Sequence, residues 1–372
     1  MEKWLNSKWP YRLWEGYKIL LFLVTPLLLS QCSGKSGVVF PEVVTLPQSV
    51  KENATQLIDT QIVSSDEHIA AKNFFVHNDS VLVVLNKPVK DHCFIELFSL
   101  SSEENYGQFV HYGNGPKEML NVQAHFSNGK LVLHDFAKHQ ITSFDVDSAL
   151  FDKSYSYRNP IWFNRNAGSP FVTFLNDDTL IMLNPYYFEN RDLKISNGEG
   201  RFIVGSSLRQ FTLYSEGSRK YYSFNVEQGC IIVNSANNRI IFASDGYPRI
   251  EIYDCHLNPL KMITGPDILD IKYHIDGNEI IYSKRIPYAY RYFAEADDGF
   301  YLKYHGAFFT GNESFQVMDS WLFKFDWDGN ILESYHCDKY LSTISLSSVP
   351  GIFYGDGYDS DGNRVLYKLT TY

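Results

Sequence analysis

The sequence predicts an all-β fold, a six-bladed β-propeller with about four antiparallel strands in each blade. Three observations support this prediction: a recurring turn-plus-strand motif, an aromatic content of 16%, and no long helical periodicity beyond the N-terminal segment. The clearest copy of the motif begins at Asn128-Gly129, two residues that tolerate positive φ and make a tight hairpin turn. The apolar run that follows is rich in β-forming residues and too short for a helix.

Copies of this motif recur at a spacing of roughly 50 to 60 residues, the period expected of a propeller blade with long loops. Asn or Asp residues form the turn in every copy except the last, where Pro350-Gly351 takes their place. We interpret the strand of each copy as the inner strand of one blade. These strands are expected at residues 81–85, 131–135, 180–183, 240–243, 300–304 and 352–354.

A second, outer strand is expected in each blade. Residues 321–325 alternate between two sets of side chains, the period-two pattern of a strand with one buried face. Related outer strands are expected at residues 95–100, 141–145, 211–214, 250–254 and 365–369, with a strand at 57–63 completing the last blade. Closing the blades into a ring would leave only short, protected sheet edges.

The charge balance bears on partners. The formal net charge is -10, whereas a nucleic-acid partner would usually demand a basic patch, so no nucleic acid is expected. The acidic residues are scattered along the chain, which is typical of solvated loops rather than of one acidic binding face.

Residues 1–31 are predicted to be a signal peptide of the lipoprotein type. A basic start precedes an apolar run at 19–29 that is too short to span a bilayer comfortably. The segment Leu28-Leu29-Ser30-Gln31-Cys32 resembles a bacterial lipobox, in which the cysteine is lipidated. Gln31 stands where that pattern prefers a small residue, and an uncleaved N-terminal membrane anchor is the alternative. Residues 32–55 are then a flexible tether, and residues 56–372 are the propeller.

Gly113-Asn114-Gly115-Pro116-Lys117-Glu118 forms a Gly-x-Gly-Pro-x-Glu turn at the end of the first repeat. Together with the lipobox and the repeat period, it resembles the six-bladed, TolB-like propeller lipoproteins of Bacteroidota over nearly all of the mature chain. Lys117 and Met119 depart from that pattern, which has Gly and an aromatic residue there. The resemblance implies a fold and a lipid anchor. It implies no mechanism, because members of the family mostly lack a defined activity.

The residues after Cys32 bear on the membrane face. Surface-export signals of Bacteroidota lipoproteins have acidic residues at this point, where this chain has Lys35. We therefore expect a lipid anchor in the outer membrane, with the domain on the periplasmic face rather than on the cell surface.

Several motifs resemble known chemical sites. The 113–118 segment lacks the following helix of a phosphate-binding loop, and Pro116 removes an amide, so we expect a structural turn capped by Glu118. The Asp-rich segments 326–330 and 356–363 suit calcium or plain hairpin turns, and we favour turns.

Histidine and cysteine patterns point to no catalytic site. His134 and His139 flank a turn without the spacing of metal ligands, so no metal, catalytic set or cofactor is predicted. Beyond Cys32, four cysteines remain, which we expect to be mainly small buried side chains. Their spacing leaves any disulfide pairing open.

Aromatic and arginine-rich segments give the candidate ligand site. Tyr and Arg together are typical of recognition surfaces, and these segments flank predicted inner strands, where loops reach the channel mouth. The predicted ligand-binding residues are Arg285, Tyr288, Tyr290, Arg291 and Tyr292 before the fifth inner strand, Tyr186, Tyr187 and Arg191 after the third, and His305 after the fifth.

The functional hypothesis is a membrane-anchored extracytoplasmic module of the cell envelope that binds a ligand or scaffolds a protein. Its partner would be an envelope protein, a peptide or a glycan. The alternative is an extracytoplasmic hydrolase or lyase with its active site at the channel mouth, using a metal or carboxylates from several blades. An inert structural module is a third possibility.

Overall fold

The computed structural model describes most of the chain from residue 39 to residue 371. The stretches outside this description are 1–38, 65–69, 90–91, 153–154, 156, 159, 163–170, 178, 185–191, 198–201, 208–213, 217–218, 222–227, 270–272, 277–278, 283–285, 310–317 and 372. No helix among the described residues is long and apolar enough to cross a membrane.

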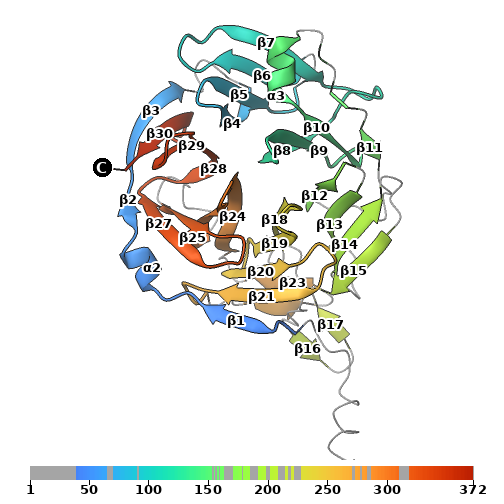
Figure 1. Cartoon of the computed structure of the whole chain (residues 1–372), viewed down its shortest axis with the longest axis vertical. Helices are drawn as coiled ribbons and strands as arrows, with labels where there is room; N and C mark the ends of the chain where they lie inside the picture. Colours follow the sequence, from blue (N-terminus) through green and yellow to red (C-terminus); the bar gives the residue numbers. More distant parts are fainter. Residues whose placement is uncertain are drawn as a thin grey trace, which may run out of the picture. The chain divides into compact units, whose positions relative to one another are not determined.

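The described chain is an all-β propeller, as the sequence predicted. Six sheets of four or five strands stand around a common axis, and each sheet runs from the axis to the outside (Figure 1). We number the sheets in chain order by their innermost strand. From the axis outward, sheet 1 is β4 (Ala71–His77), β5 (Val81–Asn86), β6 (Cys93–Ser99) and β7 (Asn105–His111). Sheet 2 is β8 (Val122–Ser127), β9 (Lys130–Asp135), β10 (Gln140–Phe144) and β11 (Ile161–Trp162). Sheet 3 is β12 (Phe171–Asn176), β13 (Thr179–Asn184), β14 (Asp192–Asn197) and β15 (Phe202–Ser207).

The last three sheets also take strands from the N-terminal part of the chain. Sheet 4 is β18 (Gly229–Asn234), β19 (Arg239–Ser244), β20 (Arg249–Tyr253), β21 (Pro259–Thr264) and β1 (Glu42–Thr45). Sheet 5 is β24 (Ile286–Ala296), β25 (Gly299–Phe309), β26 (Ser320–Phe325), β27 (Ile331–Cys337) and β2 (Thr55–Gln56). Sheet 6 is β28 (Leu341–Leu346), β29 (Ile352–Tyr358), β30 (Arg364–Thr370) and β3 (Ile58–Ser64).

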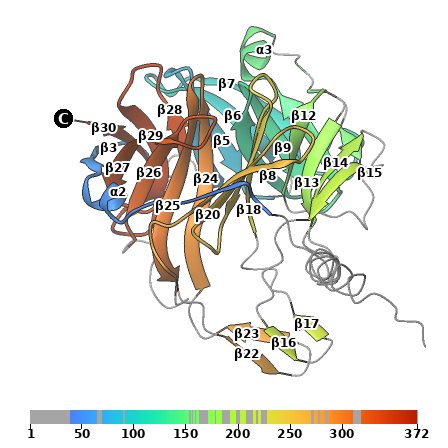
Figure 2. The ribbon, with the colours of Figure 1, turned by 60° about the horizontal axis from the view of Figure 1, so that its bottom comes forward.

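The remaining described elements lie outside these sheets. Two short helices, α2 (Ser49–Glu52) and α3 (Val146–Phe151), follow β1 and β10. Two separate hairpins, β16 (Tyr214–Glu216) with β17 (Arg219–Tyr221) and β22 (Tyr273–Asp276) with β23 (Glu279–Tyr282), stand apart from the sheets (Figure 2). The first hairpin lies in the chain between sheets 3 and 4, and the second between sheets 4 and 5. Each therefore belongs to a connection that leads into an innermost strand.

The strands predicted as inner strands are in fact the second strand of each sheet, so that part of the prediction was wrong. All six residues of β5 are buried, because neighbouring sheets cover both of its faces. The innermost strands are more polar, since one edge faces the axis. β8, for example, has the sequence Val-Gln-Ala-His-Phe-Ser.

The predicted outer strands are third strands, in β6, β10, β20, β26 and β30. The expectation for residues 211–214 falls largely outside the described residues. Tyr214 begins β16, and the third strand of sheet 3 is β14. The predicted strand at 57–63 does complete the last sheet, because β3 pairs with β30 in antiparallel register.

Hydrophobic clusters join each sheet to a neighbour. One cluster holds Phe75 of sheet 1 and Leu133 of sheet 2, and another joins Tyr354 of sheet 6 to Phe74 of sheet 1. Further clusters join sheets 2 and 3, sheets 4 and 5, and sheets 5 and 6. The core is therefore a series of apolar layers between sheets.

The predicted Asn and Asp turns are confirmed where the second strands begin. Asn78 and Asp79 have φ of 49° and 56°, and Asn128 and Gly129 have φ of 50° and 73°. Positive φ at both central residues is the type I′ geometry, whose twist matches that of the flanking strands.

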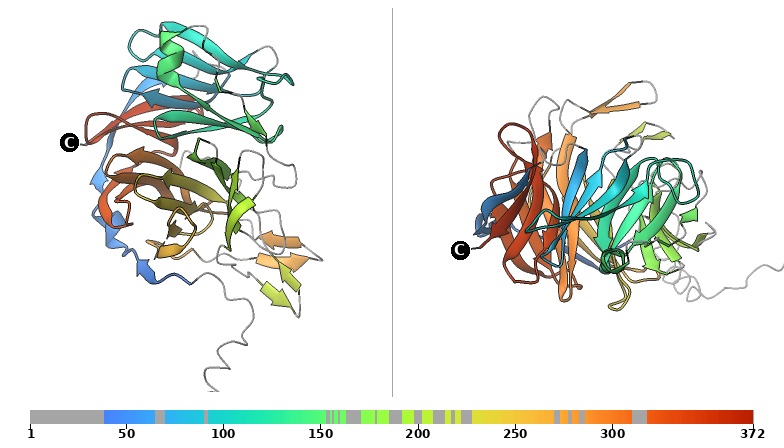
Figure 3. Two further views of the ribbon diagram at one scale, coloured as in Figure 1. Left: turned by 45° about the vertical axis from the view of Figure 1, so that its right-hand side comes forward. Right: turned by 90° about the horizontal axis from the view of Figure 1, so that it is seen from above.

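The N-terminal segment corrects the predicted tether at 32–55. β1 pairs in parallel with β21, and β2 pairs in parallel with β27, so this segment runs along the outer edges of sheets 4 and 5 before β3 joins sheet 6 (Figures 1 and 3). Phe40 and Leu46 are buried on the way, at 7% and 5% exposure. The propeller unit thus begins at about residue 40, because the edges of two sheets supply partners for this polar stretch.

Candidate functional site

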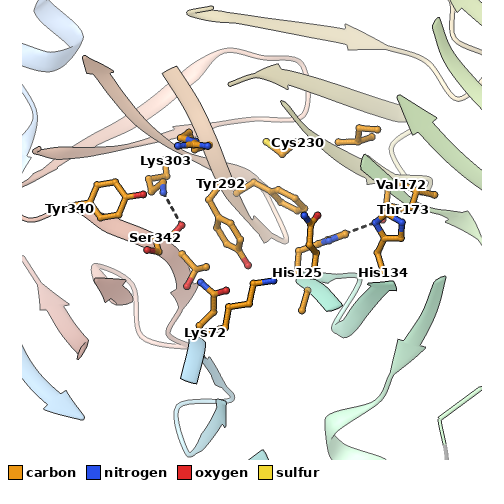
Figure 4. Close-up of a pocket in the computed structure, with 17 residues that line it drawn as sticks. Lys72, His125, His134, Val172, Thr173, Cys230, Tyr292, Lys303, Tyr340 and Ser342 are labelled. Atoms are coloured by element: carbon orange, nitrogen blue, oxygen red, sulfur yellow. Dashed lines mark hydrogen bonds between the residues drawn. The ribbon is translucent and has the colours of Figure 1, made fainter. Parts of the chain in front are cut away.

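A cavity of about 400 Å³ lies on the axis of the propeller (Figure 4). Its described walls come from all six sheets, mostly from the first half of the innermost strand and, in sheet 5, from the middle of β24. The lining residues are Lys72, Asn73, Gln123, Ala124, His125, His134, Val172, Thr173, Cys230, Ile231, Arg291, Tyr292, Phe293, Lys303, Tyr340, Ser342 and Thr343. This size lies within the usual range for small-molecule sites.

Tyr292 and Phe293 separate this cavity from a second one of about 160 Å³ toward the other end of the innermost strands. Phe75 lies beside this barrier, with its ring centroid 6.4 Å from that of Tyr292. The barrier exists because β24 is eleven residues long and contacts β8 of sheet 2. The larger cavity therefore has an aromatic floor.

A carboxylate bridges sheets 5 and 2 in the smaller cavity. Glu295 accepts hydrogen bonds from Ser127 Oγ at 2.9 Å and from the backbone N of Asn128 at 2.7 Å. Burial raises the pKa of Glu295 to about 7, against the effect of these two hydrogen bonds.

Three cationic side chains line the larger cavity: Lys72, Arg291 and Lys303. Lys303 is fully buried, and its Nζ donates to the carbonyl oxygens of Leu341 at 2.6 Å and Ser342 at 2.8 Å. Burial, followed by the nearby Arg291, lowers the pKa of Lys303 to about 7. Its ammonium thus ties sheet 5 to sheet 6 at the cavity wall.

Lys72 enters the cavity from sheet 1. Its Nζ donates to the carbonyl oxygen of Val122 at 2.7 Å, and Figure 4 shows its end pointing toward the same space as the Tyr292 hydroxyl. Burial, then the charge of Arg364, lowers the pKa of Lys72.

Arg291 is held from two sides. Its Nε lies 2.6 Å from Asp245 Oδ1, and its guanidinium carbon lies 3.8 Å from the centroid of the Tyr288 ring. β24 is irregular here, since the pairing register shifts between Tyr290 and Tyr292. Such a bulge lets Arg291 and Tyr292, which are neighbours in sequence, both line the cavity.

The opposite wall is less charged. His125 Nε2 lies 3.2 Å from Thr173 Oγ1, and burial lowers the pKa of His125 to about 4, so this imidazole is neutral at pH 7. Cys230 is a free thiol whose pKa burial raises to about 12, which makes it a poor nucleophile.

The structure places only some of the predicted ligand residues at the cavity. Arg291 and Tyr292 line the cavity, and Tyr288 supports Arg291. His305 is buried, stacks on Tyr340 with ring centroids 4.9 Å apart, and bonds the carbonyl oxygen of Asp319 through Nδ1 at 2.8 Å.

Tyr290 faces the core between sheets 4 and 5 rather than the cavity. It is fully buried, and its hydroxyl donates to the carbonyl oxygen of Gly265 at 2.8 Å. The segment 286–296 is the innermost strand of sheet 5, not a loop before it. Cys32, Tyr186, Tyr187, Arg191 and Arg285 lie outside the described residues.

Sequence reasoning missed Lys72, His125, Thr173, Lys303 and Tyr340. The available signal was the polar residues in the strand just before each apolar strand, such as Lys72-Asn73 before residues 81–85. That signal is readable only once the apolar strand is known to be second from the axis.

The Gly-x-Gly-Pro-x-Glu segment is a structural turn, as predicted. Glu118 Oε2 accepts a hydrogen bond from the backbone N of Gly115 at 2.6 Å. A Cβ on Gly113 would lie only 2.1 Å from the same oxygen, which explains the glycine there. Lys138 Nζ fastens the turn to sheet 2 by donating to the carbonyl oxygens of Gly115 and Glu118, at 2.7 and 2.6 Å.

The Asp-rich segments are turns of one recurring design. Asp326 Oδ1 accepts from the backbone N of Asp328 and Asn330 at 3.0 and 2.8 Å, and its Oδ2 accepts from the Asn330 amide at 2.8 Å. Asp359 and Asn363 repeat this arrangement. Both carboxylates are therefore engaged in stabilising their own turns. No cluster of three or more His, Cys, Asp or Glu side chains suited to a metal ion occurs among the described residues.

The family model "TolB-like 6-blade propeller-like" matches residues 53–349. The chain belongs to this TolB-like propeller family. Among curated proteins, none matches it.

Two solved structures from Bacteroides resemble this TolB-like propeller. A member of the duf4221 family from Bacteroides vulgatus has a TM-score of 0.50 at 10% identity, covering 86% of this chain and 98% of that one. A protein described as exported, from Bacteroides fragilis, has a TM-score of 0.49 at 11% identity, covering 89% and 99%. At these identities, the likeness to the first concerns the fold alone.

Proposed function

We propose that this TolB-like propeller is an extracytoplasmic binding protein of the cell envelope whose ligand occupies the larger axial cavity. The observation that carries this proposal is the cavity itself, about 400 Å³ in volume and lined by side chains from all six sheets. Polar groups over an aromatic floor are typical of ligand sites. Each of the six sheets acts as one blade of the ring.

The N-terminal sequence supports the location. The apolar run at 19–29 and the lipobox-like segment ending at Cys32 suit export and lipid anchoring in the outer membrane. Lys35 favours the periplasmic face. With the domain beginning near residue 40, the tether between lipid and propeller is short.

The lining favours binding over the alternative of carboxylate-based hydrolysis. Cleavage of glycosides by two carboxylates needs a pair of Asp or Glu side chains at the reacting bond. The described lining of the larger cavity contains lysine, arginine, histidine and tyrosine but no Asp or Glu. Asp245, which lies beside the lining residue Arg291, is paired with it.

The test is to fill the cavity. Ala124 lines it, so Ala124→Phe should occupy ligand space, while Ala137→Phe makes the same change at an exposed position in a turn. Native mass spectrometry of each variant, purified from its own envelope, should show a bound ligand with the wild type and with Ala137→Phe, and loss of it with Ala124→Phe. Equal ligand content in all three would refute the cavity as the site.

A further inference from the structure

We infer that the ligand of the larger cavity is an organic anion, with its carboxylate or phosphate bound near Lys72, Lys303 and Arg291 and its body over Tyr292 and Phe293. This inference rests on the proposed function, because it names the chemical class of the molecule that the cavity binds.

The described lining of the cavity is positively charged. Three cationic side chains line it, and no Asp or Glu does so among the described residues. The two carboxylates whose charges act on Lys303 are already matched: Asp245 pairs with Arg291, and the fully buried Asp356 pairs with Arg364 and accepts from the Asn73 amide at 3.0 Å. The two lysines contribute positive charge without a carboxylate partner in the described chain.

Both lysines have hydrogen-bond donors left for a ligand. A lysine ammonium has three donors. Lys303 uses two of them on carbonyl oxygens of sheet 6, and Lys72 uses one on Val122. The carbonyl oxygens that accept these bonds are neutral, so an anion in the cavity would gain charge-assisted hydrogen bonds from the remaining donors.

The rest of the lining suits an uncharged ligand body. The floor is aromatic, with Tyr292 and Phe293, and the far wall carries Val172 together with the neutral polar groups of Thr173 and His125. A ring or sugar fits such surroundings better than a second charge. A bare inorganic ion would leave most of a cavity of about 400 Å³ unfilled.

The overall charge of the chain also supports an anionic ligand. With a formal net charge of -10, the surface repels anions on average, so the group of three cationic side chains on the axis is a local feature. Buried positive charge is costly unless something pairs with it. A bound anion supplies that pairing.

The test uses three probes that share a phenyl ring: benzoate, phenyl phosphate and the neutral benzamide. Saturation-transfer NMR titrations should give at least one of the two anions a Kd at least fivefold lower than that of benzamide. The better of the two anions identifies carboxylate or phosphate as the preferred group.

Lys72→Gln is the informative variant, because glutamine removes the charge but can still donate to Val122. It should weaken anion binding at least fivefold and leave benzamide binding unchanged. Lys130→Gln is the matched control, since Lys130 is exposed, begins strand β9 of sheet 2 and does not line the cavity. It should change neither. Arg291 is less suitable, because its loss leaves Asp245 unpaired.

The outcomes separate the two proposals. Equal affinity for benzamide and the anions, or anion binding unaffected by Lys72→Gln, overturns the anionic ligand while leaving the cavity as a binding site. Binding of none of the three probes also overturns it. The proposed function has its own test, and it fails if Ala124→Phe retains the co-purified ligand.

Discussion

Replacing Glu118 by alanine is expected to destabilise the protein through one identifiable contact. The Glu118 carboxylate accepts a hydrogen bond of 2.6 Å from the Gly115 backbone N. A hydrogen bond to a charged group contributes about 1.5 to 3 kcal/mol, and the partial exposure of this turn favours the lower figure, about 1.5 kcal/mol.

Gly113→Ala should cost at least as much, partly because its φ of 159° is unfavourable for alanine and partly through the same contact. The new Cβ would lie 2.1 Å from Glu118 Oε2, so the carboxylate must swing away and its bond to Gly115 is lost. The two single changes therefore remove the same interaction. In the double variant, the alanine at 113 no longer meets the carboxylate and only its backbone strain remains, so the total cost should be about 1.5 kcal/mol less than the sum of the two single costs.

Chemical denaturation of the wild type, both single variants and the double variant measures this coupling. The midpoint and slope of each curve give the free energy of unfolding. If the costs of the two single changes add in the double variant, Gly113 and Glu118 act independently, and the structural explanation of the Gly-x-Gly-Pro-x-Glu turn is refuted.

Three further predictions concern the N-terminal segment, the cavity and the anchor. Deleting residues 1–48 removes the buried side chains of Phe40 and Leu46, each of which contributes about 1.5 to 3 kcal/mol. The free energy of unfolding, measured by chemical denaturation, should therefore fall by about 3 kcal/mol or more. Deleting residues 1–38 should leave it unchanged. Binding of phenyl phosphate or benzoate should weaken as pH rises through about 7, because an anion favours the protonated form of Lys303. The pKa of Lys303 is lowered to about 7 by burial and by Arg291, against the opposite effect of Asp245, Asp356 and Cys230. A Kd that does not change with pH would contradict this prediction. Cys32→Ala should abolish labelling by a radioactive fatty acid in cells, and persistent labelling would place the lipid elsewhere or exclude the lipobox.

The sequence predicted the fold class because its signals are local. Asn128-Gly129 makes a hairpin turn through its own φ angles, and short apolar runs such as 81–85 form strands wherever they lie in a sheet. Their place in the sheet was predicted wrongly, since burial on both faces comes from neighbouring sheets that a single repeat does not reveal.

The candidate site was only partly predictable for a related reason. Arg291 and Tyr292 stood out because they lie together in an aromatic segment. Lys72 and Lys303 join them only after the sheets come together around the axis, and the polar pair Lys72-Asn73 points to the axis only once the apolar strand after it is known to be second in its sheet.

The N-terminal segment shows the same limit. Its pairing partners lie more than 200 residues away, as with Thr45 and Thr264, whose hydroxyls are 3.1 Å apart. Composition alone gave this stretch the character of a tether. Contacts made far along the chain therefore had to come from the structure.

The most direct test of the central claim is a crystal structure of the protein grown with 4-bromobenzoate, in which the anomalous scattering of bromine locates the probe. We predict one strong bromine peak in the larger axial cavity, above Tyr292 and Phe293, with the carboxylate within hydrogen-bond distance of Lys72, Lys303 or Arg291. A cavity without bromine, while bromine occupies sites on the outer surface, would contradict both the site and the ligand class proposed for this propeller.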